Sequence, residues 1–303
     1  MRYDRDGFPI PPDFNPAAPD GSGPTPARRR VGVGKRIVVV ALIAGLLLPA
    51  VFGPMILPMV REFVVVWSLE QATLREVEDD LPGAVAHMTR AIDWFGDDPE
   101  LLCMRALLRL ENSDAAGAIA DADRALAAAP TSPQPLRVRA LGHVVAGDAD
   151  AALADAERVV QVSGKDDPEA LNHRAYMRAL AGRELSAALA DIDRALAGQD
   201  EPPPEFLDTR GFVRHLLGRH QEAIDDLNVA IDRTQRQRRQ VMLLAEQQDR
   251  VELARRLRWF DHALAVMHHH RGLACQAVGL QDQADQDFAV AKQKGFDPSR
   301  GVL

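Results

Sequence analysis

A motif built around one small residue recurs at a nearly constant interval, and this repeat constrains the fold more than any other feature of the chain. Segments such as GAIADADRAL, AALADAERVV and AALADIDRAL align on a single alanine. The first five anchors are almost evenly spaced, and a much longer interval precedes the last; the anchors are Ala84, Ala118, Ala152, Ala188, Ala223 and Ala284. A period of about 34 residues is typical of a solenoid, in which each unit packs on its neighbours.

Each copy of the motif indicates two helices joined by a tight turn. Upstream of five anchors an arginine is followed by a small residue, at Arg105-Ala106, Arg139-Ala140, Arg174-Ala175, Arg210-Gly211 and Arg271-Gly272. A glycine lies between the two patterns in four copies, at Gly147, Gly182, Gly218 and Gly279. Small residues allow paired helices to approach closely. We therefore predict that each unit is a helical hairpin.

The hairpin pattern resembles the tetratricopeptide repeat (TPR) family over about residues 65–296. Residues 99–132 carry the clearest copy, with Ala106, Ala118, Ala125 and Pro130 at the family's spacing. The resemblance implies an all-α, right-handed superhelical solenoid of about six hairpins. It also implies that the first helix of each hairpin lines a concave groove, which in this family usually holds peptides or partner proteins.

The family's geometry assigns a set of residues to the groove face of the first helices. These putative partner-binding residues are Arg137, Asn172, Tyr176, Asp208, Phe212, His215 and His269. In the alternative interpretation, the apolar residues of this face pack between neighbouring repeats and bind nothing.

Each recurring arginine has an aspartate at a nearly constant distance downstream. The pairs are Arg105 and Asp121, Arg139 and Asp155, Arg174 and Asp191, Arg210 and Asp226, and Arg271 and Asp287. The separation is the same in four pairs and one position longer for Arg174 and Asp191, in the unit whose turn holds one extra residue. We therefore predict ion pairs across each hairpin, from first helix to second, with a structural role.

The long interval between Ala223 and Ala284 marks an insertion at roughly 233–264. No glycine or proline lies between Arg219 and Arg271, so nothing forces the helices to stop at their usual length. We expect the second helix of the fifth unit and the first helix of the sixth to be elongated, with a turn near 244–250.

The insertion is also the most basic part of the chain. Residues 233–258 hold eight arginines and three acidic residues. This basic protrusion is a candidate surface for an anionic partner or lipid, through Arg236, Arg238, Arg239, Arg255, Arg256 and Arg258. The alternative is a solvated helix face with no partner.

The chain before the repeats divides into two segments. Residues 1–36 form a proline-rich and basic tail that we expect to be disordered. Residues 37–60 contain no charged side chain, and a helix of about 20 apolar residues suffices to cross a bilayer. Basic residues precede this predicted transmembrane helix, which favours a cytoplasmic N-terminus and a repeat domain (61–303) outside the cytoplasm. We expect the first hairpin directly afterwards, with helices near 63–79 and 82–95.

Composition and motifs argue against catalysis. The net charge is −8, and the part beyond residue 60 is more acidic still, so we expect no nucleic-acid partner. The two cysteines lie far apart in sequence, and no phosphate-binding loop or nucleophile motif is present. Three consecutive histidines, 268–270, point about 100° apart on a helix and cannot chelate one ion. We expect no cofactor and no metal.

The sequence therefore predicts a membrane-tethered, non-catalytic TPR scaffold that mediates protein–protein interaction. Two alternatives stay open. One is an adaptor that faces the cytoplasm, and the other is an accessory subunit of a membrane enzyme or assembly complex.

Overall fold

The computed structural model describes residues 2–3, 9–10, 58–60, 62–245 and 249–296. The chain divides into two units, 1–58 and 59–303. In the first unit, β1 (Arg2–Tyr3) pairs antiparallel with β2 (Pro9–Ile10). The expected disordered tail lies largely outside the described residues, and so does the expected membrane span except for 58–60. In the part of the chain that is described, no helix has both the length and the apolar character to cross a membrane.

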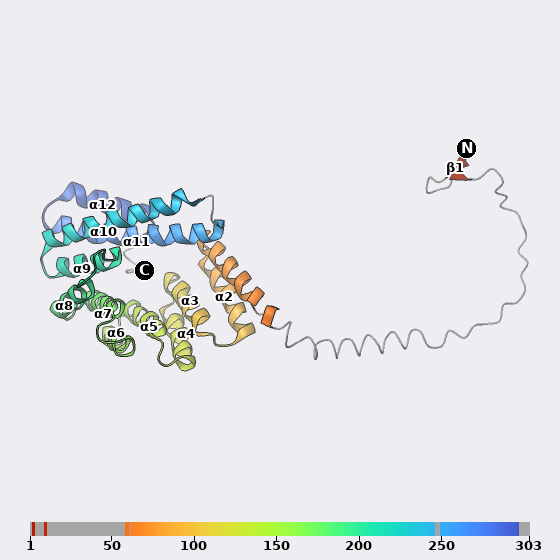
Figure 1. Ribbon diagram of the computed structural model, residues 1–303, viewed down its shortest axis with the longest axis horizontal. Coiled ribbons are helices and arrows are strands. Elements are labelled where there is room, and N and C mark those ends of the chain that lie inside the picture. Colours follow the sequence, from red (N-terminus) through yellow and green to blue (C-terminus); the bar gives the residue numbers. More distant parts are fainter. Residues whose placement is uncertain (1, 4–8, 11–57, 61, 246–248, 297–303) are drawn as a thin grey trace, which may run out of the picture. The chain divides into compact units, whose positions relative to one another are not determined.

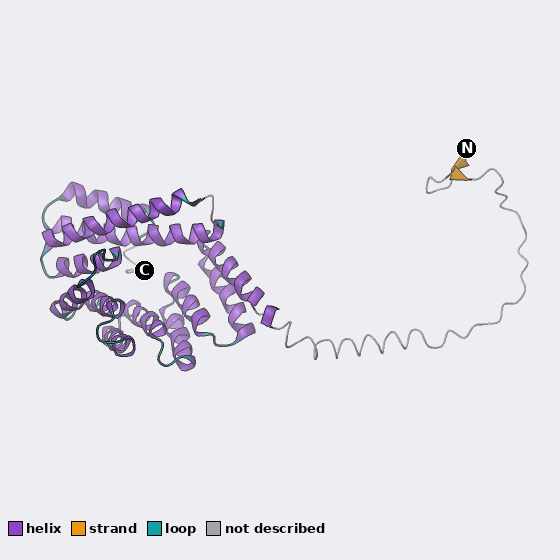
Figure 2. Cartoon of the chain, in the orientation of Figure 1, coloured by secondary structure: helices purple, strands orange, loops and turns teal. Residues whose placement is uncertain are grey.

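The second unit is all-α in its described residues and consists of six successive helical hairpins (Figures 1 and 2). The first hairpin joins a helix over 62–77 to α2 (Leu81–Phe95). The next three are α3 (Pro99–Glu111) with α4 (Ala115–Ala128), α5 (Pro133–Val145) with α6 (Ala149–Ser163), and α7 (Pro168–Leu180) with α8 (Leu185–Leu196). The last two are α9 (Pro204–Leu216) with α10 (His220–Leu243), and α11 (Arg250–Ala277) with α12 (Gln281–Gln293).

The first hairpin begins where the sequence predicts it. Its helices over 62–77 and Leu81–Phe95 are separated by only a short turn, so the prediction of two adjoining helices is confirmed. The connection from this hairpin back to the expected membrane span lies outside the described residues.

Local signals in the sequence set the ends of the helices. Asp80, Asp114 and Asp148 each accept a hydrogen bond from a backbone N–H of the first turn that follows, which satisfies a donor that the helix leaves open. The glycines between the paired helices adopt φ values of +62 to +79°, where glycine has no steric penalty. Ser113 takes the same left-handed conformation, at φ 62°, in a hairpin that lacks the glycine.

Small residues are required where the helices of a hairpin touch. All six anchor alanines are completely buried. A Cβ added to Gly211 would lie 2.7 Å from Cγ of Leu227, and one added to Gly272 would lie 2.6 Å from Cε1 of Phe288. These distances are far below van der Waals contact, so the two glycines permit a close helix–helix approach that alanine would prevent.

All five predicted Arg–Asp pairs are present across their hairpins, so the prediction of these contacts is confirmed. Each arginine donates two hydrogen bonds to its aspartate, through Nε at 2.7–2.9 Å and through Nη2 at 2.5–2.7 Å. The pair Arg105–Asp121 is almost completely buried. A third donor, Nη1, extends to the preceding hairpin, where its partners are Thr89, Asp123, Glu157, Asp193 and Asn228.

The fifth and sixth hairpins contain the two longest helices of the described chain. α10 has 24 residues and α11 has 28 residues, whereas the labelled helices α2 to α9 have 12 to 15 residues. The two long helices pack along each other and turn within 244–249. α11 consequently extends past its own hairpin toward the start of the repeat domain (Figure 1).

Candidate functional site

A cavity of about 320 Å³ opens between the first helices of three consecutive hairpins, α5, α7 and α9. It is lined by Arg137, Glu169, Asn172, His173, Tyr176, Glu205, Phe206, Asp208 and Thr209. Four of the seven residues assigned to the groove from the sequence therefore come together here: Arg137, Asn172, Tyr176 and Asp208. We call this cavity the groove pocket.

Three polar atoms in the groove pocket are buried and have no hydrogen-bond partner in the structure. They are Nε of Arg137, Oδ1 of Asn172 and Nε2 of His173. A buried polar group without a partner costs about 1–3 kcal/mol, and such groups are uncommon in native proteins. All three residues line the same cavity.

The groove pocket holds its histidine and its tyrosine in their neutral forms. Burial, assisted by the charge of Arg137, lowers the pKa of His173 to about 3. Burial, assisted by the charge of Asp208, raises the pKa of Tyr176. The pocket therefore presents a neutral histidine and a neutral tyrosine beside the single cation Arg137 and the carboxylate of Asp208, and the exposed carboxylates of Glu169 and Glu205 lie at its rim.

A histidine of the last hairpin holds the side chain of Asp208 in place. Its Oδ1 lies 2.9 Å from Nδ1 of His270, and the His270 ring stacks on Phe212 with centroids 4.1 Å apart. Sequence reasoning assigned neither His270 nor His173 to the groove face. Repeat register alone misses both, because each directly precedes a recurring arginine, one position beyond the expected groove residues Asn172 and His269.

The other three expected groove residues lie outside the groove pocket. Phe212 packs on His270, and His215 faces His220 with 3.2 Å between their Nδ1 atoms. His269 stacks on Phe296 with centroids 4.3 Å apart. The three consecutive histidines thus contact three different partners, since His268 lies 2.7 Å from Asp287. Within the described residues, no group of acidic, histidine or cysteine side chains is arranged to hold a metal ion.

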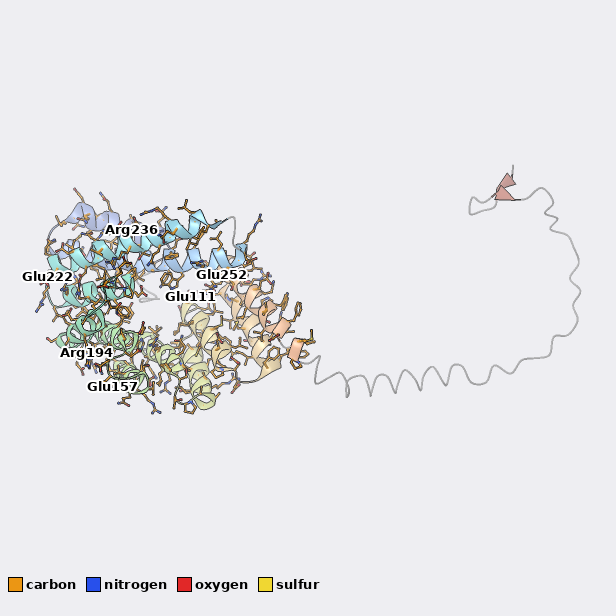
Figure 3. The ribbon with its side chains drawn as sticks, in the orientation of Figure 1. Glu111, Glu157, Arg194, Glu222, Arg236 and Glu252 are labelled. Atoms are coloured by element: carbon orange, nitrogen blue, oxygen red, sulfur yellow. The ribbon has the colours of Figure 1, made fainter. Side chains whose placement is uncertain are left out.

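Much of the charge on the basic protrusion is paired within the chain. Arg236 contacts Asp232 at 2.6 Å, Arg238 contacts Asp261 at 3.1 Å and Arg255 contacts Glu252 at 2.8 Å. Arg258 contacts Glu76 and Glu111. Figure 3 places Arg236 on α10 and Glu252 on α11. Arg239 is exposed on α10, and Arg256 lines a second, larger cavity.

Both cysteines are buried thiols. Burial, with the charge of Asp121 next in importance, raises the pKa of Cys103 to about 11. Burial also raises the pKa of Cys275. A nucleophilic cysteine requires a lowered pKa and access to solvent, so neither thiol is suited to covalent chemistry.

The described part of the repeat domain is an all-α array of TPR-like helical hairpins. No family model and no curated protein matches the sequence. Among solved structures, it is similar to a thermophilic TPR protein of Thermus thermophilus, with 22% identity over 54% of this chain and 90% of that chain and a TM-score of 0.46. It is also similar to a tetratricopeptide repeat protein from Parabacteroides merdae, with 16% identity over 79% and 97% of the two chains and a TM-score of 0.45.

A third similar structure is PilW, described as a type IV pilus biogenesis factor. It shares 17% identity over 68% of this chain and 98% of that chain, with a TM-score of 0.41. None of these likenesses carries an inference about function at such identities and scores.

Proposed function

We propose that this protein is a non-catalytic scaffold that binds an extended peptide segment of a partner protein in the groove pocket. The supporting observation is the set of three buried polar atoms without partners, on Arg137, Asn172 and His173. A peptide main chain offers both N–H and C=O groups at close spacing. It can therefore supply an acceptor to the guanidinium and a donor to the amide oxygen of the same pocket.

The rim of the groove pocket favours a particular kind of peptide. Glu169 and Glu205 are exposed there, and Arg137 has Asp167 4.0 Å away. A basic side chain on the bound segment would contact the rim carboxylates. Because exposed ion pairs contribute little affinity, about 0–1 kcal/mol, the main-chain contacts provide most of the binding, and the rim selects among sequences.

The test is quantitative co-purification with the full chain. Asn172→Ala removes the side-chain amide and is expected to weaken binding of the partner about 5- to 150-fold, since lost hydrogen bonds to buried groups cost on the order of 1–3 kcal/mol. Asn112→Ala is the matched control, because Asn112 is exposed at the turn between α3 and α4. Equal recovery with both variants would refute peptide binding at this pocket.

We further propose that residues 37–60 tether this scaffold to a membrane, with the repeat domain outside the cytoplasm. The support for the span is that this segment contains no charged side chain. The support for the orientation is that five basic residues lie at 28–36, on its N-terminal side. Protease treatment of intact cells tests the orientation. Digestion of the repeat domain supports the proposal, and protection of that domain favours an adaptor that faces the cytoplasm.

The exposed side of the basic protrusion is a second contact surface in this proposal. Arg236, Arg239 and Arg255 are exposed and suit a partner or lipid surface with negative charge. Binding through this surface would weaken as salt is raised, whereas binding through the groove pocket would depend on salt much less.

A further inference from the structure

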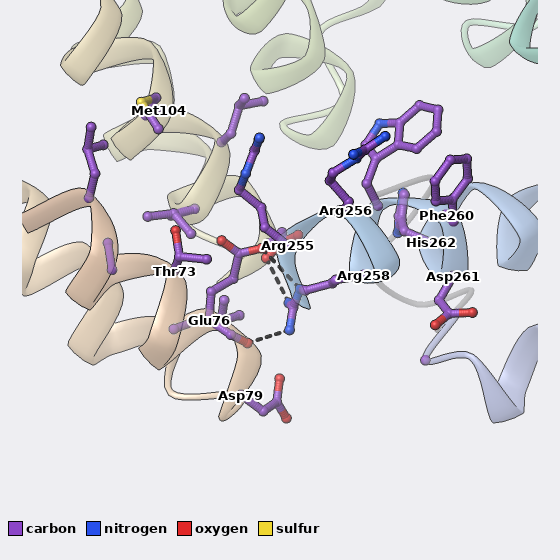
Figure 4. A pocket seen from close by; sticks show the side chains of 18 of the residues that line it. Thr73, Glu76, Asp79, Met104, Arg255, Arg256, Arg258, Phe260, Asp261 and His262 are labelled. Atoms are coloured by element: carbon purple, nitrogen blue, oxygen red, sulfur yellow. Dashed lines mark hydrogen bonds and ion pairs between the residues drawn. The ribbon is translucent and has the colours of Figure 1, made fainter. Parts of the chain in front are cut away.

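One side chain connects the two ends of the repeat array. Arg258, on α11, forms an ion pair through Nε with Oε1 of Glu76 at 3.0 Å and donates a hydrogen bond from Nη2 to Oε2 of Glu111 at 3.2 Å. Its Nη1 also donates to the backbone carbonyl of Glu76. All three acceptors belong to the first two hairpins, and Figure 4 shows the guanidinium beside Glu76.

The position of Glu76 at the end of a helix strengthens its contact with Arg258. Glu76 lies in the last turn of the helix over 62–77, where backbone carbonyls lack partners within the helix and carry partial negative charge. Arg258 therefore bonds to a helix C-terminus as well as to two carboxylates. A lysine could not reproduce this, because its ammonium is a point charge without the planar fork of arginine.

Contacts between the first and last units are not expected in a simple solenoid. In a repeat array each unit contacts only its neighbours, whereas the partners of Arg258 lie 182 and 147 residues away in sequence. The insertion makes the contact possible, because α11 has 28 residues and extends beyond its own hairpin. The array is thus closed end to end.

Arg258, Glu76 and Glu111 also line an open cavity of about 790 Å³. Met104 lines it from the first two hairpins and Phe260 from α11 (Figure 4). Leu69, Leu107 and Trp259 also belong to its lining. Trp259 is 54% exposed, and Met104 and Leu107 are each 38% exposed. The apolar walls are therefore incompletely packed against each other, so the two sides can separate without disrupting a dense core.

We propose that Arg258 is a clasp that holds the long hairpin against the first two hairpins, and that its release opens both the array and this cavity. The proposal goes beyond peptide binding in the groove pocket, which lies on α5, α7 and α9. Glu76, Glu111 and Arg258 are 24%, 33% and 31% exposed, so water or a competing charged group can reach all three. Without Arg258, the carboxylates of Glu76 and Glu111 would lose their ion pairs with α11.

The clasp is tested by a distance measurement that needs no ligand. Spin labels are placed at Glu70→Cys, in the first helix, and at Gln240→Cys, in α10, in the full chain. Both positions are exposed, whereas Cys103 and Cys275 are buried, so labelling is selective. We expect one narrow distance distribution for the parent chain and a longer, broader one for Arg258→Glu.

Two further variants make the result specific. Arg239→Glu introduces the same charge reversal on exposed α10 and should leave the distribution unchanged. Combining Arg258→Glu with Glu76→Arg should move the mean distance back toward the parent value. If Arg258→Glu lowers the helix content measured by circular dichroism, Arg258→Gln takes its place. A parent-like distribution for the folded Arg258 variant, or an already broad one for the parent chain, would overturn the proposal.

Discussion

Arg139 donates two parallel hydrogen bonds to the carboxylate of Asp155, from Nε at 2.8 Å and from Nη2 at 2.6 Å. Its Nη1 donates to Asp123 of the preceding hairpin at 2.6 Å. One side chain therefore joins the two helices of its own unit and links that unit to its neighbour. Because the arrangement recurs in five hairpins, these arginines stabilise both the unit and the interface, the two terms that set the stability of a repeat array.

The first prediction concerns the most buried of these pairs. Asp121→Asn removes the charge that balances Arg105 and Arg109, both of which donate to Asp121. Loss of one partner of a buried pair costs about 3–5 kcal/mol, and urea unfolding followed by circular dichroism should show it. The control is Asp232→Asn, whose pair with Arg236 is exposed and should be worth about 0–1 kcal/mol. Equal losses would contradict a structural role for the recurring pairs.

The second prediction concerns Gly211. Glycine to alanine in a helix normally stabilises by about 1 kcal/mol, but here the new methyl group would lie 2.7 Å from Cγ of Leu227. We expect Gly211→Ala to destabilise the protein by about 1–3 kcal/mol. Leu227→Ala added to that variant should cost less than Leu227→Ala in the parent chain, since it relieves the clash. If the losses of stability caused by Gly211→Ala and Leu227→Ala simply add in thermal unfolding, the two helices do not approach closely at this point.

The third prediction concerns pH. His173 has a folded-state pKa of about 3 and an ordinary value of 6.5, so between these values the unfolded chain binds the extra proton. Its contribution to stability is present above about pH 6.5 and is lost as pH falls toward 3, with a slope of up to about 1.4 kcal/mol per pH unit. His173→Gln should show a shallower slope than the parent chain in urea midpoints measured from pH 7 to 4. Parallel slopes would mean that His173 titrates normally.

A fourth prediction follows from the buried thiols. We expect Cys103 and Cys275 to react slowly with a thiol reagent in the native protein, because both thiols are buried and their pKa values are raised. In denaturant both should react at once. Rapid native labelling of either thiol would place it at the surface and contradict the packing described here.

Much of the fold could be predicted from the sequence, because its determinants are local and repeated. The period located the hairpins, and the constant spacing of the arginine and aspartate pairs located the bond between Arg174 and Asp191 despite the extra turn residue. The lengths of α10 and α11 followed from the absence of glycine and proline between Arg219 and Arg271. In each case a short stretch of chain contains the whole signal.

Contacts across the array could not be predicted in the same way. The bonds of Arg258 to Glu76 and Glu111 depend on the accumulated rotation of six units, which no local spacing encodes. The neighbours of the expected groove residues could not be predicted either, since His269 lies against Phe296 and His215 against His220. The long α11 also brings His270 onto Phe212 of another hairpin.

The most direct test of the groove pocket as the partner-binding site is photo-crosslinking in cells that naturally produce the protein. A photoreactive amino acid replaces Glu169, which is exposed at the rim of the pocket, and in a parallel experiment replaces Gln161, which is exposed on the second helix α6. We expect a crosslinked partner peptide from position 169 and none from position 161. No crosslink at 169, or equal crosslinking at both positions, would contradict it.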